Sequence, residues 1–212
     1  MCDHCMHGGC SGCSGHTGGH CGNQCFSVGP FRAISKVCPP VRTGAGSRIA
    51  FSSGIVPAIL VSAASGLIGT VSAVGFGTSI TGLTLVNNAI TLPVVGTGVT
   101  EAFTVSQAGS ITTIAATFTE TVGITVPIVG SATIRAEIYR APAGSNSFTP
   151  TGAAVNLTPS ITGLVSVGAI FQGSATTDVP VAVGDRLVMV FSTSGGLATT
   201  LTGAASAGIT IS

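Results

Sequence analysis

The chain has 212 residues, of which only 6% are Asp, Glu, Lys or Arg, 45% are hydrophobic and 31 are glycine, and its formal net charge is +1. An ordinary soluble domain has roughly a quarter of its residues charged, so this surface would have to consist of Ser, Thr, Gly and small apolar side chains. Near-zero charge and 5% aromatics without tryptophan disfavour partners such as nucleic acid, anionic membrane or stacked sugars. We therefore expect much of the surface to be buried against other copies of the chain.

The chain begins MCDHCMHGGC, which contains neither the basic nor the apolar region of a secretory signal. Its most apolar stretch, 55–61 (IVPAILV), is well short of the ~20 residues that a membrane-spanning helix needs. We expect a protein that is made without a signal peptide and does not partner a membrane.

Residues 1–25 form a predicted arm that is rich in Cys, His and Gly and nearly free of aliphatic side chains, so it cannot bury a core of its own. Residues 26–47 are predicted to be a connector, in which Pro30, Pro39 and Pro40 favour an extended path. The seven cysteines all lie in these two parts and are the candidates for disulfides between chains: Cys2, Cys5, Cys10, Cys13, Cys21, Cys25 and Cys38.

These cysteines admit three interpretations. Seven is an odd number, so at least one thiol must pair with another chain, stay free or be modified, and closely spaced cysteines suit links between neighbours. Two CxxC pairs with nearby imidazoles also offer ligands for Zn or Cu, although usual zinc modules separate such pairs by about a dozen residues or more. The candidate metal ligands are Cys2, Cys5, Cys10, Cys13, His4, His7, His16 and His20. Redox catalysis would need a folded βαβ context. We favour intermolecular disulfides, no cofactor and no enzymatic activity, with metal binding as the alternative.

Residues 48–212 are predicted to form an all-β domain, because short runs of Val, Ile, Thr and Phe alternate with Gly, Pro, Asn and Ser. The glycines in 66–76 argue for strand or loop there rather than helix. The expected strands are 80–86, 102–105, 110–118, 132–140, 165–171, 177–181, 186–192 and 204–211.

Two of these strands indicate how their faces are used. In 133–139 (TIRAEIY), apolar even positions predict a core face, and odd positions predict a solvated face that carries Tyr139 and lets Arg135 pair with Glu137. In 186–191 (RLVMVF), both faces are apolar, so both must be covered. We expect the second cover to be the opposing sheet or a neighbouring subunit.

The acids of the β domain are scattered, with no His or Cys in the same domain, and we interpret them as solvated turn or ion-pair residues rather than catalytic carboxylates. They are Glu101, Glu120, Glu137, Asp178 and Asp185. A receptor- or sugar-binding head would need an exposed aromatic or apolar site, and Tyr139 with nine phenylalanines offers no obvious one.

Seven stretches occur in this order: 47–54 (SRIAFSSG), 66–71 (GLIGTV), 74–77 (VGFG), 109–116 (GSITTIAA), 147–150 (SFTP), 186–192 (RLVMVFS) and 205–209 (ASAGI). Together they resemble the C-terminal domain of BclB-related exosporium proteins of Bacillus-type spores. The resemblance implies an antiparallel β-sandwich, a jelly roll of the complement C1q/tumour-necrosis-factor kind, which trimerises. It also implies a turn at 183–187, where Gly184 permits the bend and Asp185 bonds nearby backbone. The family's collagen-like Gly-X-Y stalk is missing here, and the Cys/His arm stands in its place.

The residues and the resemblance together predict a structural protein of the bacterial spore surface, in the exosporium or an appendage, made in the mother cell. The β domain is expected to form a homotrimer, or to continue into a filament or lattice. The arm is expected to cross-link the assembly or to anchor it to other spore-surface proteins.

Overall fold

The computed structural model describes residues 46–62, 68–93, 101–125, 130–195 and 198–212. By its contacts the chain divides into Met1–Arg42 and Thr43–Ser212, and everything described below belongs to the second unit. The predicted arm, and the connector up to residue 45, lie outside the described residues. Within the described ranges, every regular element is a β-strand.

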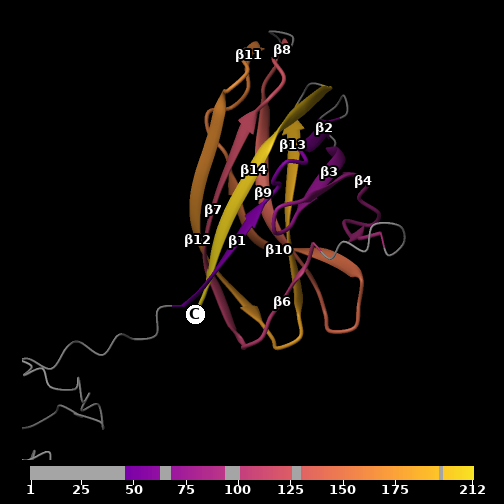
Figure 1. Ribbon diagram of the computed structural model, residues 1–212, viewed down its shortest axis with the longest axis vertical. Helices are drawn as coiled ribbons and strands as arrows, with labels where there is room; N and C mark the ends of the chain where they lie inside the picture. The colour runs from indigo at the N-terminus through magenta and orange to yellow at the C-terminus, as the bar shows by residue number, and fades with distance from the viewer. Residues whose placement is uncertain (1–45, 63–67, 94–100, 126–129, 196–197) are drawn as a thin grey trace, which may run out of the picture. The chain divides into compact units, whose positions relative to one another are not determined.

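The strands are β1 (Ser47–Ser52), β2 (Ala58–Ser62), β3 (Ile68–Val74), β4 (Ser79–Leu83), β5 (Ile90–Thr91), β6 (Phe103–Thr104), β7 (Gly109–Glu120), β8 (Ile124–Thr125), β9 (Ala132–Ala141), β10 (Ser147–Asn156), β11 (Leu164–Val165), β12 (Ile170–Val181), β13 (Arg186–Gly195) and β14 (Thr199–Ile211). They pack in two antiparallel layers that are joined where β2 pairs with β3 (Figure 1). The layer that we call the β7 sheet has the order β12-β7-β14, with β1 and β2 both paired to the other edge of β14. The layer that we call the β13 sheet has the order β3-β13-β9-β10-β5, with β4 beside β3 and β6 beside β13.

The chain crosses repeatedly between the layers: β7 lies in the first, β9 and β10 in the second, β12 in the first, β13 in the second and β14 in the first. This winding of antiparallel strands between two packed sheets is the jelly-roll pattern. The fold is an all-β jelly roll.

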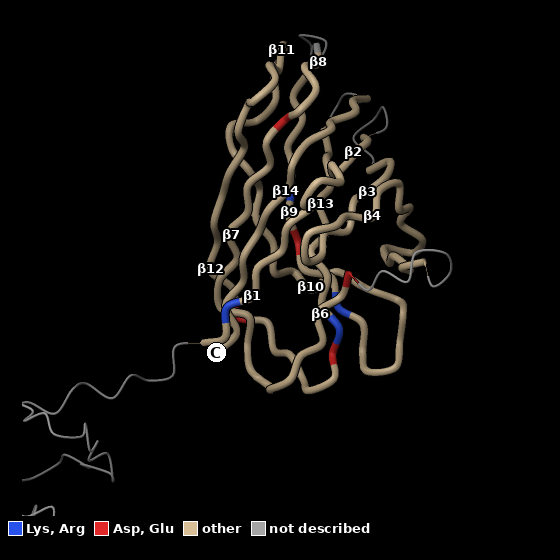
Figure 2. Tube along the Cα trace, in the orientation of Figure 1, with Lys and Arg blue, Asp and Glu red and all other residues tan. Residues whose placement is uncertain are grey.

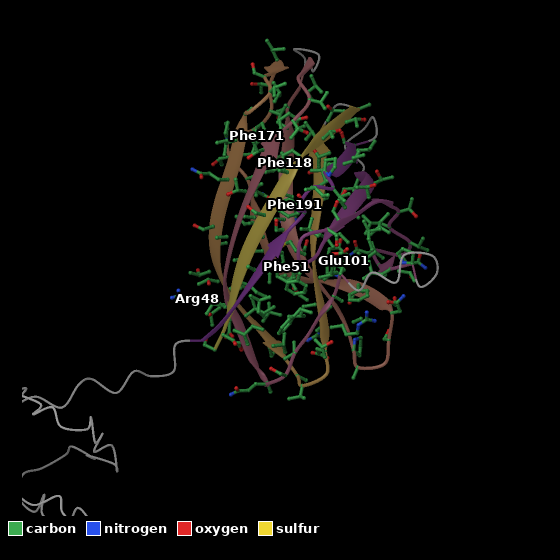
Figure 3. All side chains as sticks on the ribbon, viewed as in Figure 1. Arg48, Phe51, Glu101, Phe118, Phe171 and Phe191 are labelled. Atoms are coloured by element: carbon green, nitrogen blue, oxygen red, sulfur yellow. The ribbon has the colours of Figure 1, made fainter. Side chains whose placement is uncertain are left out.

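The main core lies between the two sheets, where alternate residues of each strand point inward. Phe118 of β7 and Phe191 of β13 meet across it, with ring centroids 6.4 Å apart, and both side chains are fully buried (Figure 3). Phe171 of β12 and Phe51 of β1 belong to the same core. Burial of each such side chain contributes about 1.5–3 kcal/mol.

A second core lies on the outer side of the β13 sheet, because β13 is apolar on both faces, as its sequence predicts. Val188 and Val190 point away from the main core and are fully or almost fully buried. Segment 79–92 of the same chain covers them, with Ile90 and Leu92 in the cluster, and Asn146 Nδ2 donates to the Leu92 carbonyl at 2.6 Å. The second cover is therefore neither the opposing sheet nor a neighbouring subunit, which were the two expected covers, but the chain itself.

In strand β9, the predicted pairing of Arg135 with Glu137 is confirmed, and the predicted exposure of Tyr139 is wrong. Arg135 Nε lies 3.0 Å from Glu137 Oε2, so the expected ion pair along the strand is present. Tyr139, however, is only 5% exposed and packs in the second core. The face predicted to be solvated is therefore solvated only at its first half.

Most predicted strands are present, but 165–171 is not one strand. A turn separates β11 from β12, and Gly168 has a φ of 84° there, which suits glycine best. The turn at 183–187 is present as the resemblance implies. Gly184 has a φ of 87°, and Asp185 Oδ2 accepts from the Ala182 N–H at 2.9 Å.

Candidate assembly interface

The outward-pointing side chains of β1, β14, β7 and β12 form one broad surface, which we call the β7 face. Strand registers align them in rows across the four strands. One row is Ala50, Gly208, Ala115 and Ser174, and the next is Ser52, Ser206, Thr117 and Gln172. The strands are about 4.8 Å apart and rise about 3.3 Å per residue, so the face covers roughly 600 Å² in projection.

Charge is nearly absent from the β7 face, and Figure 2 shows charged residues as a few isolated segments of the chain. Its four strands contain three charged residues, and one of these, Glu120, points into the core. The other two are exposed: Arg48 on the β1 margin, and Asp178 on the β12 margin next to the core-packed Val179. Both lie near the same end of the strands. Arg48 pairs in register with Thr210, and this row of residues continues across β7 to Thr176, two positions before Asp178 on β12.

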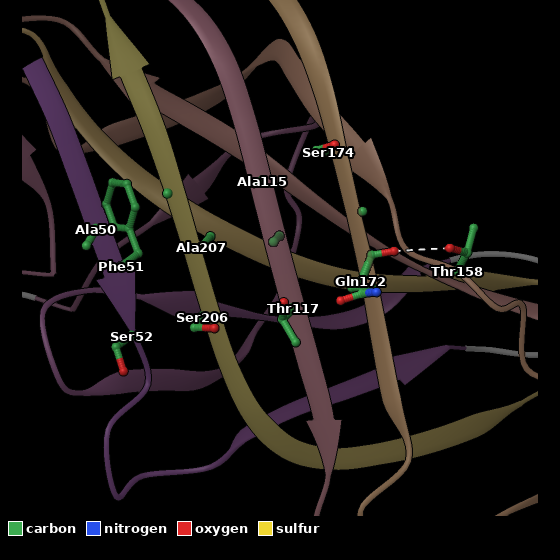
Figure 4. A pocket seen from close by; sticks show the side chains of 13 residues that line it. Ala50, Phe51, Ser52, Ala115, Thr117, Thr158, Gln172, Ser174, Ser206 and Ala207 are labelled. Carbon is green, nitrogen blue, oxygen red and sulfur yellow. Dashed lines mark hydrogen bonds between the residues drawn. The ribbon is translucent and has the colours of Figure 1, made fainter. Parts of the chain in front are cut away.

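The β7 face is hollowed where its side chains are smallest. The two middle rows line a depression of about 730 Å³ that crosses all four strands (Figure 4). At its β12 side, Thr158 Oγ1 donates to the Gln172 carbonyl at 3.1 Å and fixes that margin. Alanine, glycine and serine thus leave a concave, neutral surface rather than a pocket built around polar groups.

Gly208, in the middle of this depression, is not required by the packing of its own domain. A Cβ atom built there would find its nearest neighbour, the Ile49 carbonyl oxygen, at 3.8 Å, which is ordinary contact. Gly203 on the same strand differs, because a Cβ there would lie 2.6 Å from the Phe118 ring. Glycine weakens a strand interior and often marks a place where another chain approaches closely. The domain itself therefore leaves room for a side chain at position 208.

Three of the acids are buried. Asp185 is 9% exposed and lies 3.8 Å from Arg140 Nη1, as an ion-pair residue of its turn. Glu120 and Glu101, by contrast, were expected to be solvated and are fully or almost fully buried. Glu120 is 0% exposed, and its Oε1 accepts from the Thr202 N–H at 3.0 Å while Oε2 has no hydrogen-bond partner. Burial raises the pKa of Glu120, and backbone N–H groups of Thr202 and Val122 offset part of that rise. Glu101 is 1% exposed and accepts from the Thr78 hydroxyl. Neither carboxylate opens onto the β7 face.

Tyr139 is a second described residue whose pKa departs from its ordinary value. Its burial in the second core raises the pKa, the Glu137 carboxylate raises it further, and the Arg135 guanidinium lowers it. Like Glu120, Tyr139 belongs to the interior of the domain. The perturbed groups therefore report packing and do not assemble a reactive centre.

The candidate cross-linking and metal-binding residues predicted from the sequence, from Cys2 to Cys38 and from His4 to His20, lie outside the described residues. Intermolecular disulfides and a Zn or Cu site both stay predictions. In the part of the chain that the structure describes, no three His, Cys, Asp or Glu residues are grouped as a metal site would need. Those ranges also contain no helix that is long and apolar enough to cross a membrane.

No protein-family model matches the chain, and a search of curated proteins finds no match. Among solved structures, the chain is similar to one described as "Structure of Eiger TNF from S. frugiperda", with a TM-score of 0.35 and 8% sequence identity over 80% of this chain and 94% of that chain.

The β7 face was not predicted as a site, although its elements were visible in the sequence. Strands 110–118 and 204–211 were expected, and their alternate residues are Thr, Ala, Ser and Gly. The missing information was which strands are neighbours. Registers between β1, β14, β7 and β12 connect residues that are 51 to 164 positions apart.

Proposed function

We propose that this protein is a structural subunit that assembles with copies of itself on the bacterial spore surface. Its β domain associates as a trimer through the β7 face, and the cysteines from Cys2 to Cys38 cross-link or anchor the assembled subunits. One observation carries the proposal. In the described part of the chain, segment 79–92 covers the outer side of the β13 sheet, whereas the β7 face stays open, neutral and lined with small side chains.

The chemistry of the β7 face favours burial against a protein. Removal of charged groups from water is expensive, and here only Arg48 and Asp178, both on margins, would be affected. Serine and threonine hydroxyls both donate and accept hydrogen bonds, so the same face on another copy can satisfy them. The projected area of the face approaches the ~800 Å² per partner of a standard interface.

The two charges also support a closed ring rather than a random association. A cyclic assembly uses head-to-tail contacts, in which one margin of a subunit meets the opposite margin of the next. In such a ring, Arg48 of one copy approaches Asp178 of its neighbour. Neither side chain has an ion-pair partner among the described residues of its own chain.

The spore surface enters the proposal through the resemblance of 48–212 to BclB-related exosporium domains, and the cysteine count supports covalent assembly. Seven cysteines cannot all pair within one chain. If the protein is made in a reducing cytoplasm and exposed when that cell lyses, oxidation would lock subunits after they have assembled.

The assembly is tested by Gly208→Val in the full chain, measured under reducing conditions by light scattering after size exclusion. Valine suits a strand, and a Cβ at position 208 meets no atom of the domain closer than 3.8 Å, so the variant should stay folded and become monomeric. Thr91→Val, at an exposed position of β5, is the matched control and should keep the wild-type mass. Unchanged mass for Gly208→Val would exclude the β7 face as the interface.

The cross-links are tested separately by electrophoresis in detergent with and without reductant, after oxidation of the assembled protein. A ladder of multiples that collapses to one band with reductant is expected. Replacement of all seven cysteines by serine should remove the ladder and leave the trimer intact. Migration that is the same with and without reductant would refute the covalent part of the proposal.

A further inference from the structure

An exposed apolar cluster lies at one end of the β domain. Of the nine large hydrophobic side chains exposed in the described part of the chain, four belong to the segments where β7 passes into β8 and β11 passes into β12. We call them the apolar tip: Val122, Leu164, Val167 and Ile170, which are 52%, 72%, 68% and 57% exposed. Clustered exposed apolar side chains usually mark an interaction site.

The apolar tip is built on hydrogen-bonded backbone. The β8–β11 ribbon pairs Leu164 with Thr125, and Ile170 pairs with Thr119 of β7. The Glu120 N–H donates to the Ala169 carbonyl and the Gly168 N–H donates to the Glu120 carbonyl, at 2.9 and 2.8 Å. The domain therefore presents these side chains to solvent in a defined arrangement, because its own backbone holds them there.

The apolar tip and the start of β1 lie at opposite ends of the strands. Ser47 pairs with Ile211 at the end of β14, whereas Thr119, beside Ile170, pairs with Ala204 near its beginning. Figure 1 shows β8 and β11 at the top and the start of β1 with the C-terminus at the bottom. The segment preceding β1 therefore joins the domain at the end remote from the tip.

The sequence before β1 contains one apolar stretch that could cover such a surface. Residues 26–37 (FSVGPFRAISKV) carry Phe26, Val28, Phe31, Ile34 and Val37, whereas residues 1–25 are nearly free of large apolar side chains. Cys25 and Cys38 flank this stretch, and it contains no cysteine itself.

Distance favours the tip of another copy over the tip of the same domain. Val37 precedes Ser47 by ten residues, which span at most ~35 Å when extended. From Ser47 to the β8–β11 ribbon, the strands run about 40 Å at about 3.3 Å per residue. The C-terminal end of 26–37 therefore falls short of its own tip, so the complete stretch can dock only on the tip of another copy. A copy placed end to end brings its tip directly to the start of β1.

We propose that the apolar tip of one copy receives residues 26–37 of a second copy placed end to end with it. This inference rests on the proposed self-assembly and adds its axial contact. A head-to-tail contact does not close on itself, so it extends trimers into a fibre. Docking also holds Cys25 and Cys38 at each junction, where disulfides between arms of neighbouring copies can lock the fibre.

The proposal is tested by complementation in the full chain with reductant present, with masses from sedimentation velocity. One variant, Leu164→Asp/Val167→Asp, disables the tip, and a second, Phe31→Asp/Ile34→Asp, disables the segment. Each alone should stop at the single trimer, with end-to-end affinity at least about tenfold weaker than wild type. Val86→Asp, at a comparably exposed valine away from the tip, should behave as wild type.

A mixture of the two variants should form paired trimers and nothing longer, because one working tip meets one working segment. A mixture that stays at the mass of a single trimer would overturn the proposal. So would a segment variant that still associates end to end, since tips would then bind each other. A variant that falls to the mass of one chain would instead count against the β7 face, so the two proposals fail separately.

Discussion

The buried carboxylate of Glu120 should make the stability of the β domain fall as pH rises. Its folded pKa lies above the ordinary value of 4.5 because the side chain is buried, so the folded state retains the proton over a range in which the unfolded chain has lost it. Below about pH 4.5 both states are protonated and this group has no effect. As pH rises from there through the raised pKa, stability is lost.

Glu120→Gln should remove that loss. The amide keeps the shape of the side chain and an acceptor for the Thr202 N–H, and it cannot ionise. Oε2 of Glu120 has no partner, and an unsatisfied buried polar atom costs about 1–3 kcal/mol, more when charged. We expect the variant to match wild type near pH 4 and to exceed it by about 1–3 kcal/mol at pH 8.

The measurement is urea unfolding followed by circular dichroism from pH 4 to pH 8, with reductant and at one protein concentration, because assembly itself adds stability. Glu137→Gln is the control. It removes the charge that pairs with Arg135 and leaves one side-chain oxygen where Arg135 and the Gly152 N–H each had an acceptor, so it should not gain stability on the alkaline side. Parallel pH curves for wild type and Glu120→Gln would refute the reasoning.

Three further outcomes follow from the same contacts. Arg48→Glu should weaken trimer formation by up to roughly fivefold per contact, and adding Asp178→Arg should restore it. If the double variant does not regain the trimer affinity in sedimentation equilibrium, that pairing is excluded. Gly203→Ala should destabilise the fold by about 1–3 kcal/mol in urea unfolding, because its Cβ would meet the Thr119 backbone carbonyl oxygen and the Phe118 ring, and an unchanged midpoint would contradict that close approach. Phe118→Ala should cost about 3–5 kcal/mol in the same assay, and a loss below 1 kcal/mol would contradict its place in the core.

Much of the fold was predictable because the pattern of alternating residues is local. Strand 186–192 was expected to be apolar on both faces, and both faces are buried. The identity of the outer cover was not predictable, since segment 79–92 has no alternation that assigns it to β13. Its contact with β13 joins positions about a hundred residues apart.

The burial of Glu120 could have been predicted from the sequence. Ala116, Phe118 and Glu120 alternate along β7, so the carboxylate belongs to the same face as two core residues. The general tendency of acids to be solvated outweighed that signal. At Tyr139 the alternation was followed instead: it placed the tyrosine on the solvated face with Arg135 and Glu137, although a tyrosine ring buries readily and this one is buried.

The β7 face could not be assembled from the sequence, because its small side chains acquire meaning only as rows across neighbouring strands. Gly208 illustrates this. In the sequence it is one of 31 glycines. Only its register with Ala50 and Ala115, and the 3.8 Å from a Cβ at that position to the Ile49 carbonyl oxygen, show that its own domain leaves room for a side chain.

The most direct test of the account is the mass of the unmodified full chain in solution with reductant present, measured by sedimentation equilibrium across micromolar concentrations. We predict a species of three times the 20.6 kDa chain mass, and multiples of it where trimers join end to end. A stable particle of one-chain mass at every concentration would contradict the claim that the neutral β7 face is covered by other copies.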